Sequence, residues 1–406
     1  MRQSTIALPI LYDKTFETKT VIDDSVNIRS IEELNYTRSQ LSYYLKNGLA
    51  IYDGENAYYT DNPSDELLKR FFESKILKIG FEEKEDYLYL KRRGINPQNM
   101  MFDLAIASYI LNPSKDSYRL DDIVLEELGI IVDSSLNESQ MMIDGFSNED
   151  NSEKVAKYAK FIYLAKEVLQ NKLQEKEQYK LFNEIEMPLV KVLAEMEYKG
   201  VLADKEMLEK YSVEFAKKVD SLMKDIWDIA GEEFNVNSPK QLGTILFEKL
   251  QLPVLKKTKS GYSTDADVLE KLRTEHPIIE KILEYRTINK LKATYVDGML
   301  PLINKDDGRI HANFKQTVTA TGRISCTDPN LQNIPIRTEL EKELRKIFIA
   351  PENHVFIDAD YSQIELSVLA HISNDEKMID AYYNKAQAIL AFEDKSESEY
   401  REALTL

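Results

Sequence analysis

Cysteine is nearly absent from this sequence, since Cys326 is the only one among 406 residues. A single thiol excludes an intramolecular disulfide framework and a zinc site built from cysteines, and it fits a reducing, cytoplasmic setting. Glycine and proline are scarce too, with 13 and 12 residues, which excludes collagen-like and low-complexity chains. No run of about eighteen residues lacks charged side chains, so the sequence predicts no transmembrane helix. What remains is a globular composition, long enough for roughly two to four domains.

Basic residues are outnumbered by acidic ones, and the formal net charge of −17 argues by itself against a nucleic-acid partner. The distribution is uneven, however. Residues 237–337 hold 16 basic and 11 acidic side chains, a net charge of +5, and the rest of the chain carries −22. This basic island is typical of a local site for a polyanion, although charge alone is equally compatible with a solvated charged face.

The first 180 residues mix short apolar runs with helical patterns, which predicts an α/β layer. Two apolar runs flank turn residues at 53–56, and this arrangement predicts a β-hairpin. Ser64 is expected to cap a helix, and residues 75–80 form a candidate buried strand.

The chain beyond residue 152 has a mainly helical pattern, with a strong helix start where Ser238 precedes Pro239. A lysine-rich loop at 256–259 precedes a long basic helix, an arrangement suited to gripping a phosphate backbone. The expected elements are helices over 152–200, over 204–230, from 238 and over 277–300, strands over 309–319 and 354–360, and a helix over 362–371.

Asp360 follows the apolar residues 355–357 at the expected junction of a strand and a helix. A carboxylate that a rigid element holds in such a place can bind a hard cation such as Mg²⁺. The alternative is that Asp360 only caps the helix, which is the more frequent role of an Asp after a strand. The residue alone does not decide between the two.

Two long motifs lie around this position. Residues 319–337 read T-A-T-G-R-I-S-C-T-D-P-N-L-Q-N-I-P-I-R, and residues 360–366 read D-Y-S-Q-I-E-L. They resemble the T-A-T-G-R-L-S-S-x-D-P-N-L-Q-N-I-P segment and motif A, D-Y-S-Q-I-E-L-R, of the bacterial DNA polymerase I family, the family A polymerases. The resemblance extends back through 234–250, 290–295, 183–190 and, more faintly, 101–113.

The resemblance implies a multidomain chain of α/β and α+β type. We expect a degenerate 3′–5′ exonuclease-type domain of ribonuclease-H-like fold over 1–182 and the start of the palm over 183–204. A helical thumb would follow over 205–310, and a palm with motif A and an antiparallel sheet over 311–383. Residues 384–406 do not resemble the family.

The resemblance also assigns catalytic residues. Asp360, assisted by the carbonyl of Tyr361, would bind both Mg²⁺ ions of an in-line phosphoryl transfer from dNTP to the primer 3′-oxygen. Glu365 would close the space near C2′ of the incoming sugar and so reject ribonucleotides. The nucleotide would be surrounded by Tyr361, Ser362, Gln363 and Glu365.

The same resemblance implies contacts with a DNA primer–template. Minor-groove contacts would come from Arg323, Asn330, Gln332 and Asn333. Donors there accept every correct base pair, because each pair presents N3 or O2 acceptors in the minor groove. Phosphates would be held by thumb lysines, an expectation that agrees with the basic island. The candidate lysines are Lys256, Lys257, Lys259, Lys290 and Lys292.

The exonuclease-type domain departs from the family pattern, which needs D-x-E on the first strand, a further Asp and Y-x-x-x-D. Asp86 matches the middle position and Tyr158 the tyrosine, but Ile162 stands in place of the last aspartate. Asp53 and Glu55 fit D-x-E only as letters, because they lie in the expected hairpin turn. We therefore expect no proofreading and a structural role for this domain.

The sequence also lacks the R-x-x-x-K and N-F-G-x-x-Y-G of the fingers and the H-D-E of motif C. Only one of the metal carboxylates of the palm is present, and no Lys or Arg of the fingers is present to hold a triphosphate. We interpret the chain as a fragment or the product of a truncated gene, which alone is not expected to polymerise.

Three hypotheses remain at this stage. The first is a DNA-directed DNA polymerase by lineage, with roles in DNA replication and repair. The second is a non-catalytic module that binds primer–template DNA, which we favour for the chain alone. The third, a 3′–5′ exonuclease, is disfavoured by Ile162. In each case we expect a cytoplasmic, nucleoid-associated bacterial monomer that binds DNA, with dNTPs as partners of the complete enzyme and no membrane.

Overall fold

The structure is a computed structural model that describes residues 25–132, 151–258, 261–336, 338–361 and 363–382. It divides into two units, Met1–Ile349 and Ala350–Leu406, and each is described by itself. In the described part of the chain, no helix is both long and apolar enough to cross a membrane.

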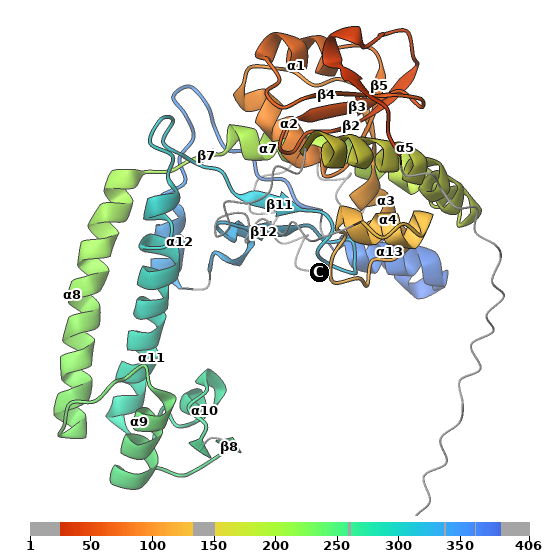
Figure 1. Cartoon of the computed structure of the whole chain (residues 1–406). Helices are drawn as coiled ribbons and strands as arrows, with labels where there is room; N and C mark the ends of the chain where they lie inside the picture. Colours follow the sequence, from red (N-terminus) through yellow and green to blue (C-terminus); the bar gives the residue numbers. More distant parts are fainter. Residues whose placement is uncertain (1–24, 133–150, 259–260, 337, 362, 383–406) are drawn as a thin grey trace, which may run out of the picture. The chain divides into compact units, whose positions relative to one another are not determined.

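A six-stranded mixed sheet forms the N-terminal part of the first unit, in the order β1-β4-β3-β2-β5-β6 (Figure 1). The β2–β3 and β3–β4 pairs are antiparallel, and the other three pairs are parallel. The strands are β1 (Ile28–Ser30), β2 (Gln40–Tyr44), β3 (Leu49–Tyr52), β4 (Ala57–Thr60), β5 (Leu77–Gly80) and β6 (Met100–Asp103). The associated helices are α1 (Asp65–Phe72), α2 (Glu83–Arg92), α3 (Leu104–Leu111), α4 (Leu120–Leu128) and α5 (Asn151–Glu175).

The local signals in this region predicted its elements correctly. β3 and β4 form the expected hairpin, and the Asp53 carboxylate accepts hydrogen bonds from the Glu55 and Asn56 amides at 2.9 and 2.7 Å. Ser64 caps α1 by accepting a hydrogen bond from the Leu67 amide at 3.2 Å. The strand expected at 75–80 is present as β5.

The two faces of the sheet are covered by different helices. Along β3, Leu49 and Ile51 belong to an apolar cluster with α1, whereas Ala50 and Tyr52 pack with residues of α5. Successive residues of a strand point to opposite faces, so covering both faces accounts for a fully buried strand. This packing explains why β3 is apolar throughout rather than alternating.

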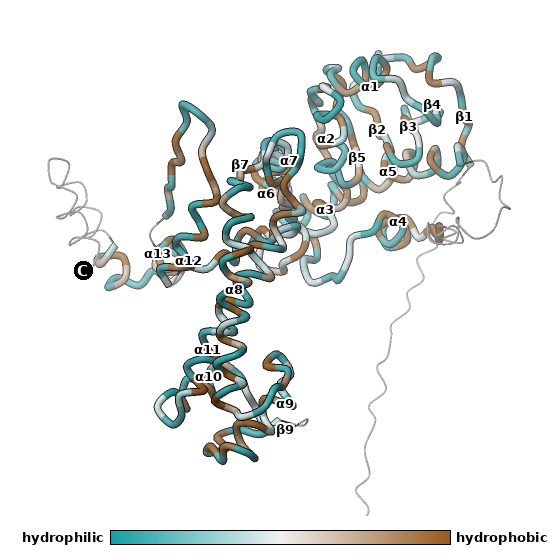
Figure 2. Tube along the Cα trace, turned by 90° about the vertical axis from the view of Figure 1, so that its left-hand side faces the viewer, coloured by the Kyte–Doolittle hydropathy of each residue, from teal (hydrophilic) through white to brown (hydrophobic). Residues whose placement is uncertain are grey.

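The rest of the first unit is mainly helical, as expected. Its helices are α6 (Tyr179–Leu181), a π-helix (Phe182–Glu186), α7 (Met187–Lys199), α8 (Lys205–Ala230), α9 (Pro239–Thr244), a second π-helix (Ile245–Lys249), α10 (Ala266–Lys271), α11 (Pro277–Lys290), a third π-helix (Leu291–Val296), a 3₁₀-helix (Leu300–Leu302), a 3₁₀-helix η6 (Leu331–Asn333) and α12 (Glu339–Arg345). The long helices α8 and α11 pack side by side. Apolar and polar residues alternate along both (Figure 2), which is typical of helices buried on one face.

The helix starts in this region follow from capping residues. The Asp204 side chain accepts a hydrogen bond from the Met207 amide at 2.9 Å, which begins α8 at the expected residue. Ser238 caps α9, and Pro239 occupies the first turn, where its missing N–H is not needed. The helix expected over 277–300 is α11, and it continues through the third π-helix to Val296.

Short antiparallel pairs complete the first unit. They are β7 (Val201–Leu202) with β10 (Arg309–Ile310), β11 (Asn313–Lys315) with β12 (Ser325–Thr327), and β8 (Lys257–Thr258) with β9 (Gly261–Tyr262). The single strand expected over 309–319 is therefore wrong in its continuity. Its two halves pair with different strands, and between them the His311 ring is hydrogen-bonded to the Glu197 carbonyl and the Asp307 carboxylate.

The second unit contains α13 (Ile364–Ser373), which matches the helix expected over 362–371. The strand expected over 354–360 is wrong. Val355, Phe356 and Ile357 are 80%, 61% and 88% exposed in a segment without regular secondary structure. A strand needs a neighbour for its backbone hydrogen bonds, and none of the described strands pairs with these residues. The apolar pattern of these residues does not show whether another strand is available to pair with them.

Candidate nucleic-acid interface

The β11–β12 hairpin and η6 bring several predicted DNA-contacting residues together. The Thr319 hydroxyl donates to the Arg323 carbonyl at 2.7 Å, which closes the loop before β12, and the Arg323 side chain is exposed. The Gln332 side-chain amide donates to the Ile324 carbonyl at 2.9 Å. The Gln332 side chain therefore reaches the residue that follows Arg323, and both Arg323 and Gln332 are exposed.

Asn330 and Asn333 lie at the two ends of η6, and both make hydrogen bonds within the protein. The Asn330 side chain accepts a hydrogen bond from the Gln332 amide at 3.0 Å and so caps η6. The Asn333 carbonyl accepts a hydrogen bond from the Tyr295 hydroxyl, which ties η6 to the third π-helix. Asn330 thus has a clear structural role beside the predicted one.

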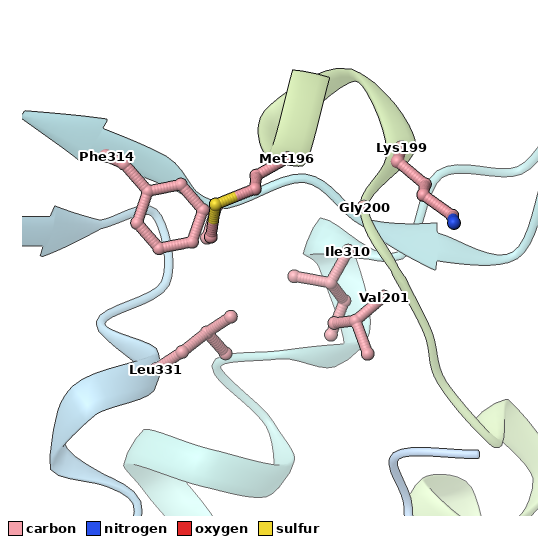
Figure 3. A pocket seen from close by; sticks show the side chains of 8 residues that line it. Met196, Lys199, Gly200, Val201, Ile310, Phe314 and Leu331 are labelled. Atoms are coloured by element: carbon pink, nitrogen blue, oxygen red, sulfur yellow. The ribbon is translucent and has the colours of Figure 1, made fainter. Parts of the chain in front are cut away.

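An apolar pocket of about 230 Å³ lies beside this hairpin. Figure 3 shows Met196, Phe314 and Leu331 around the opening, while the Lys199 side chain points away. A triphosphate needs cationic side chains or several backbone amides directed at it. The pocket offers an apolar lining instead, so its chemistry does not fit a nucleotide.

Two of the lysines expected to bind phosphates lie in or beside the β8–β9 hairpin, between α9 and α10. Lys257 is exposed on β8, with its ammonium 5.6 Å from the centre of the Tyr262 ring. Lys256 is 3.4 Å from the Asp265 carboxylate, and both side chains are largely exposed. Lys290 is exposed at the end of α11. Lys259 lies outside the described residues.

Lys292 differs from these lysines because it is part of an internal network. Its ammonium pairs with one carboxylate oxygen of Asp297. The other oxygen of Asp297 accepts a hydrogen bond from the Ser212 hydroxyl of α8 at 2.7 Å. Partial burial opposes ionisation, but the contacts with Lys292 and Ser212 lower the pKa of Asp297. The network joins α8 to the third π-helix, which favours a structural role for Lys292.

Other charges of the basic island are also engaged within the protein. Lys281 pairs with Asp225 of α8 at 2.8 Å. The half-buried Arg286 guanidinium donates to the carbonyl and the hydroxyl of Thr264. Part of the positive charge counted in the sequence is therefore neutralised or used inside the fold.

The motif A residues lie in the second unit. Asp360 and Glu365 are exposed, and Tyr361 is 79% exposed. Gln363 precedes α13 with a φ of 53°, and its side-chain carbonyl accepts a hydrogen bond from the Tyr382 hydroxyl at 3.4 Å. Ser362 lies outside the described residues.

These residues do not by themselves fit a metal centre. Mg²⁺ prefers six oxygen ligands in near-octahedral geometry, and Asp360 offers one carboxylate. Within the described ranges, no group of three or more His, Cys, Asp or Glu side chains could hold a metal ion. The magnesium site expected from the sequence therefore stays a prediction.

Comparisons with known proteins place these observations in a family. The family model for DNA polymerase family A matches residues 205–391, and that for the ribonuclease H-like domain of DNA polymerase I matches residues 31–132. The chain belongs to DNA polymerase family A. This membership confirms the resemblance carried by the two motifs and the expected ribonuclease-H-like fold.

Individual relatives agree with this membership. The chain is 41% identical over 382 residues to DNA polymerase I of Lactococcus lactis subsp. lactis, which covers 94% of this chain and 42% of the relative. It is 43% identical over 351 residues to DNA polymerase I of Bacillus subtilis, covering 83% and 39%. The chain thus spans about two fifths of the length of these curated relatives.

A solved structure is similar as well. The POL domain of Pol1 from M. smegmatis, in complex with DNA primer-template and dNTP, has a TM-score of 0.73 and 33% sequence identity. The match covers 86% of this chain and 61% of that chain.

The ribonuclease H-like domain of this family A chain carries the predicted nuclease positions on different elements. Asp53 and Glu55 are in the β3–β4 turn, where Glu55 pairs with Arg38 at 2.9 Å. Tyr158 is buried on α5, and its hydroxyl donates to Asp121 of α4 at 2.6 Å. Ile162 is fully buried on the same helix. The turn interpretation of Asp53 and Glu55 is confirmed.

Asp86 lies in a buried acidic cluster that also contains Glu83 and Asp103. The Asp103 carboxylate caps α3 by accepting from the Ala105 amide at 2.7 Å, and it also accepts from the Glu83 amide at 2.7 Å. Burial raises the pKa of Asp103 to about 6, although the backbone hydrogen bonds oppose this. Burial likewise raises the pKa of Glu83 and of Asp86 well above their usual values.

Sequence reasoning singled out Asp86 but missed Glu83 and Asp103. Asp103 had a detectable signal, because it directly precedes the apolar helix 104–111 and Asp is a preferred N-cap residue. Glu83 had none, since the burial of this first-turn glutamate depends on packing between distant segments.

Proposed function

We propose that this chain binds a DNA primer–template as part of a family A DNA polymerase, acting as a monomer on cytoplasmic, nucleoid-associated DNA in replication and repair. The observation that carries the proposal is the grouping of Arg323, Asn330 and Gln332 on one hairpin and its adjoining helix turn. The similar M. smegmatis POL domain, which is in complex with primer-template, supports DNA as the partner.

The chemistry of the hairpin suits a sequence-independent contact. Arg323 is exposed, its guanidinium is a multiple N–H donor, and donors are what the minor-groove acceptors N3 and O2 require. Because these acceptors occur in every Watson–Crick pair, a contact of this kind holds a correct primer end whatever its sequence. A mispaired end shifts the acceptors and weakens the contact.

The helical region, residues 205–310, would hold the duplex through its phosphates. Lys257 and Lys290 are exposed, and so is Lys256, although its ammonium lies 3.4 Å from the Asp265 carboxylate. Lys259 is a further candidate on sequence grounds. Each neutralised phosphate releases counterions, so affinity is expected to fall steeply with salt. Lys292 is withdrawn from this set because it pairs with Asp297.

Catalysis of nucleotidyl transfer belongs to the proposal only at the level of the complete enzyme. Asp360 and the Tyr361 carbonyl are our candidate metal ligands, Glu365 is the candidate for sugar selection, and Ser362 and Gln363 are candidates for nucleotide contact. With a single metal carboxylate among these residues, we favour non-catalytic DNA binding for this chain alone. An exonuclease is disfavoured because Ile162 stands in place of one carboxylate and Asp53 and Glu55 lie in the β3–β4 turn.

The test is fluorescence anisotropy with a labelled primer–template at several salt concentrations. We expect Arg323→Ala to weaken binding about tenfold, since one good groove contact is worth roughly 1–3 kcal/mol. The matched control is Arg29→Ala, which removes an exposed arginine on β1. A salt-independent Kd, or equal losses in the two variants, would contradict the proposed interface.

A further inference from the structure

A hydrogen bond links the ribonuclease H-like domain to the loop that carries Arg323. Tyr109 lies on α3 and is 4% exposed, and its hydroxyl donates to the Thr319 carbonyl at 2.8 Å. Burial raises the pKa of Tyr109, and hydrogen bonding to the Gly322 backbone partly offsets this effect. The hydroxyl therefore binds the first residue of the segment 319–322.

Hydrogen bonds also hold the two ends of this loop, since the Gln316 side-chain amide donates to Glu186 and the Gln332 side-chain amide donates to the Ile324 carbonyl. Residues 316–324 form neither helix nor strand. Inside the loop, the Thr319 hydroxyl donates to the Arg323 carbonyl, so a shift at Thr319 is transmitted to Arg323. Gly322 has a φ of 77°, a conformation that glycine adopts without strain, and this allows the chain to turn sharply just before Arg323.

A second set of contacts holds the strand that enters the loop. Lys84 of α2 pairs with the buried Glu197 of α7 and donates to the Asn313 side chain at 3.1 Å. The Glu197 carboxylate also accepts a hydrogen bond from the Phe314 amide in β11. The ribonuclease H-like domain thus fixes β11 at one end and the loop at the other.

We propose that Tyr109 is a positioning residue for DNA binding, and that the ribonuclease H-like domain serves this chain by holding the 319–323 loop in its binding conformation. This inference rests on the proposed function, because it assumes that Arg323 contacts primer–template. Loss of the Tyr109 hydroxyl frees the Thr319 carbonyl, and Arg323 then samples conformations that do not reach the groove.

The chain contains a matched control for Tyr109. Tyr118 lies against it in an edge-to-face contact, with ring centres 5.7 Å apart. Its hydroxyl also donates to a backbone carbonyl at 2.8 Å, but the acceptor is Asn112 within the same domain. Tyr109→Phe and Tyr118→Phe therefore remove the same group from the same apolar cluster, and only the first change affects the loop.

The experiment measures trypsin cleavage of the Arg323–Ile324 bond in the folded chain, identified by the mass of the fragment that begins at Ile324. Cleavage after Arg29 in the same digest is the internal reference. We expect Tyr109→Phe to speed cleavage at Arg323 about fivefold, the size of one lost hydrogen bond, and to weaken primer–template binding by a similar factor. Tyr118→Phe is expected to change neither.

A second variant guards against general destabilisation. Thr319→Val removes the hydroxyl that donates to the Arg323 carbonyl. Thr319 is partly exposed in the loop, so this change leaves the buried apolar clusters intact. If Tyr109 acts through this loop, the double variant Tyr109→Phe/Thr319→Val loses less affinity than the two single losses combined.

The outcomes separate the inference from the function on which it rests. Equal cleavage rates in the two Tyr variants, or an unchanged Kd in Tyr109→Phe, would overturn the positioning role. If the unaltered chain does not bind primer–template at all, the proposed function fails, and the positioning role in DNA binding fails with it. The cleavage rates then show separately whether Tyr109 holds the loop.

Discussion

Two regions of this chain match sequence motifs of DNA polymerase I. The matching polar residues are largely exposed in one region and buried in the other. In the β11–β12 hairpin and the adjoining η6, Arg323 and Gln332 are exposed, and hydrogen bonds to the Arg323 and Ile324 carbonyls hold this region together. In the ribonuclease H-like domain, Asp86 and Tyr158 are buried, and Ile162 replaces a carboxylate with a fully buried apolar side chain. The first arrangement can meet a ligand, and the second stabilises a fold.

The ribonuclease H-like domain has Ile162 where the family pattern has an aspartate, but it keeps its packing and its contacts. Its core is complete, with Tyr43, Phe71 and Phe72 packed edge to face on the sheet. Its surface still contacts the rest of the first unit through Lys84 and Tyr109. Under our proposal, this domain supports the loop that carries Arg323.

The largest predicted effect tests whether the buried nuclease position can be restored. Ile162→Asp recreates the letters of Y-x-x-x-D, but it places a carboxylate in a site with no exposed surface. Burying an unpaired charge is strongly unfavourable, so we expect a loss of roughly 3–5 kcal/mol in the free energy of unfolding. Urea unfolding measures this loss. The control is Ile162→Asn, because Asn has nearly the same shape as Asp but no charge.

The same variant can break the comparison. A folded Ile162→Asp chain that released 3′ nucleotides from single-stranded DNA in the presence of Mg²⁺ would show that the domain retains a usable nuclease centre. We expect no such release, because Asp53 and Glu55 are committed to the β3–β4 turn.

A smaller effect concerns pH. Burial, with the nearby charges of Asp103 and Asp86, raises the pKa of Glu83, so the folded state keeps a proton that the unfolded state releases above its ordinary value near 4.5. Stability is therefore lost as pH rises above that value. Glu83→Gln removes the contribution of Glu83, while Asp86 and Asp103 keep theirs, and we expect it to add on the order of 1–2 kcal/mol at pH 8 but little at pH 5.

Urea unfolding between pH 5 and pH 8 measures this difference. The control is Glu82→Gln, which changes the exposed neighbour that pairs with Lys46 and is expected to leave the pH profile in place. A stability of the unaltered chain that increases from pH 5 to pH 8, with no gain in Glu83→Gln, would show that Glu83 is ionised in the fold.

The sequence predicted most of the elements, because their signals are local. Ser64, Asp204 and the Ser238–Pro239 pair each begin a helix where expected, since a cap acts within one turn. The family motifs located the hairpin residues for the same reason, as Arg323 and Gln332 are close in the chain.

The errors arose where a residue depends on a distant partner. Residues 354–360 have the apolar pattern of a strand, but no described strand pairs with them. The basic island was counted as free charge, yet Lys281 pairs with Asp225, which lies 56 residues away on α8. Composition and periodicity do not show which distant residues pair. The burial of Glu83 could not be predicted either, because it depends on packing between distant segments.

The smallest predicted effect separates a phosphate-binding lysine from a structural one. Lys257→Ala removes an exposed charge from β8, so we expect a two- to threefold weaker Kd and a salt slope that decreases by about 1. Lys292→Ala breaks the pair with Asp297, so we expect a stability loss of about 1 kcal/mol without a change in the salt slope. Anisotropy titrations in increasing KCl and urea unfolding of both variants provide the two readouts. If Lys292→Ala reduced the salt slope as much as Lys257→Ala, Lys292 would have to leave Asp297 to meet a phosphate, and the division between inward and outward charges would fail within the helical region.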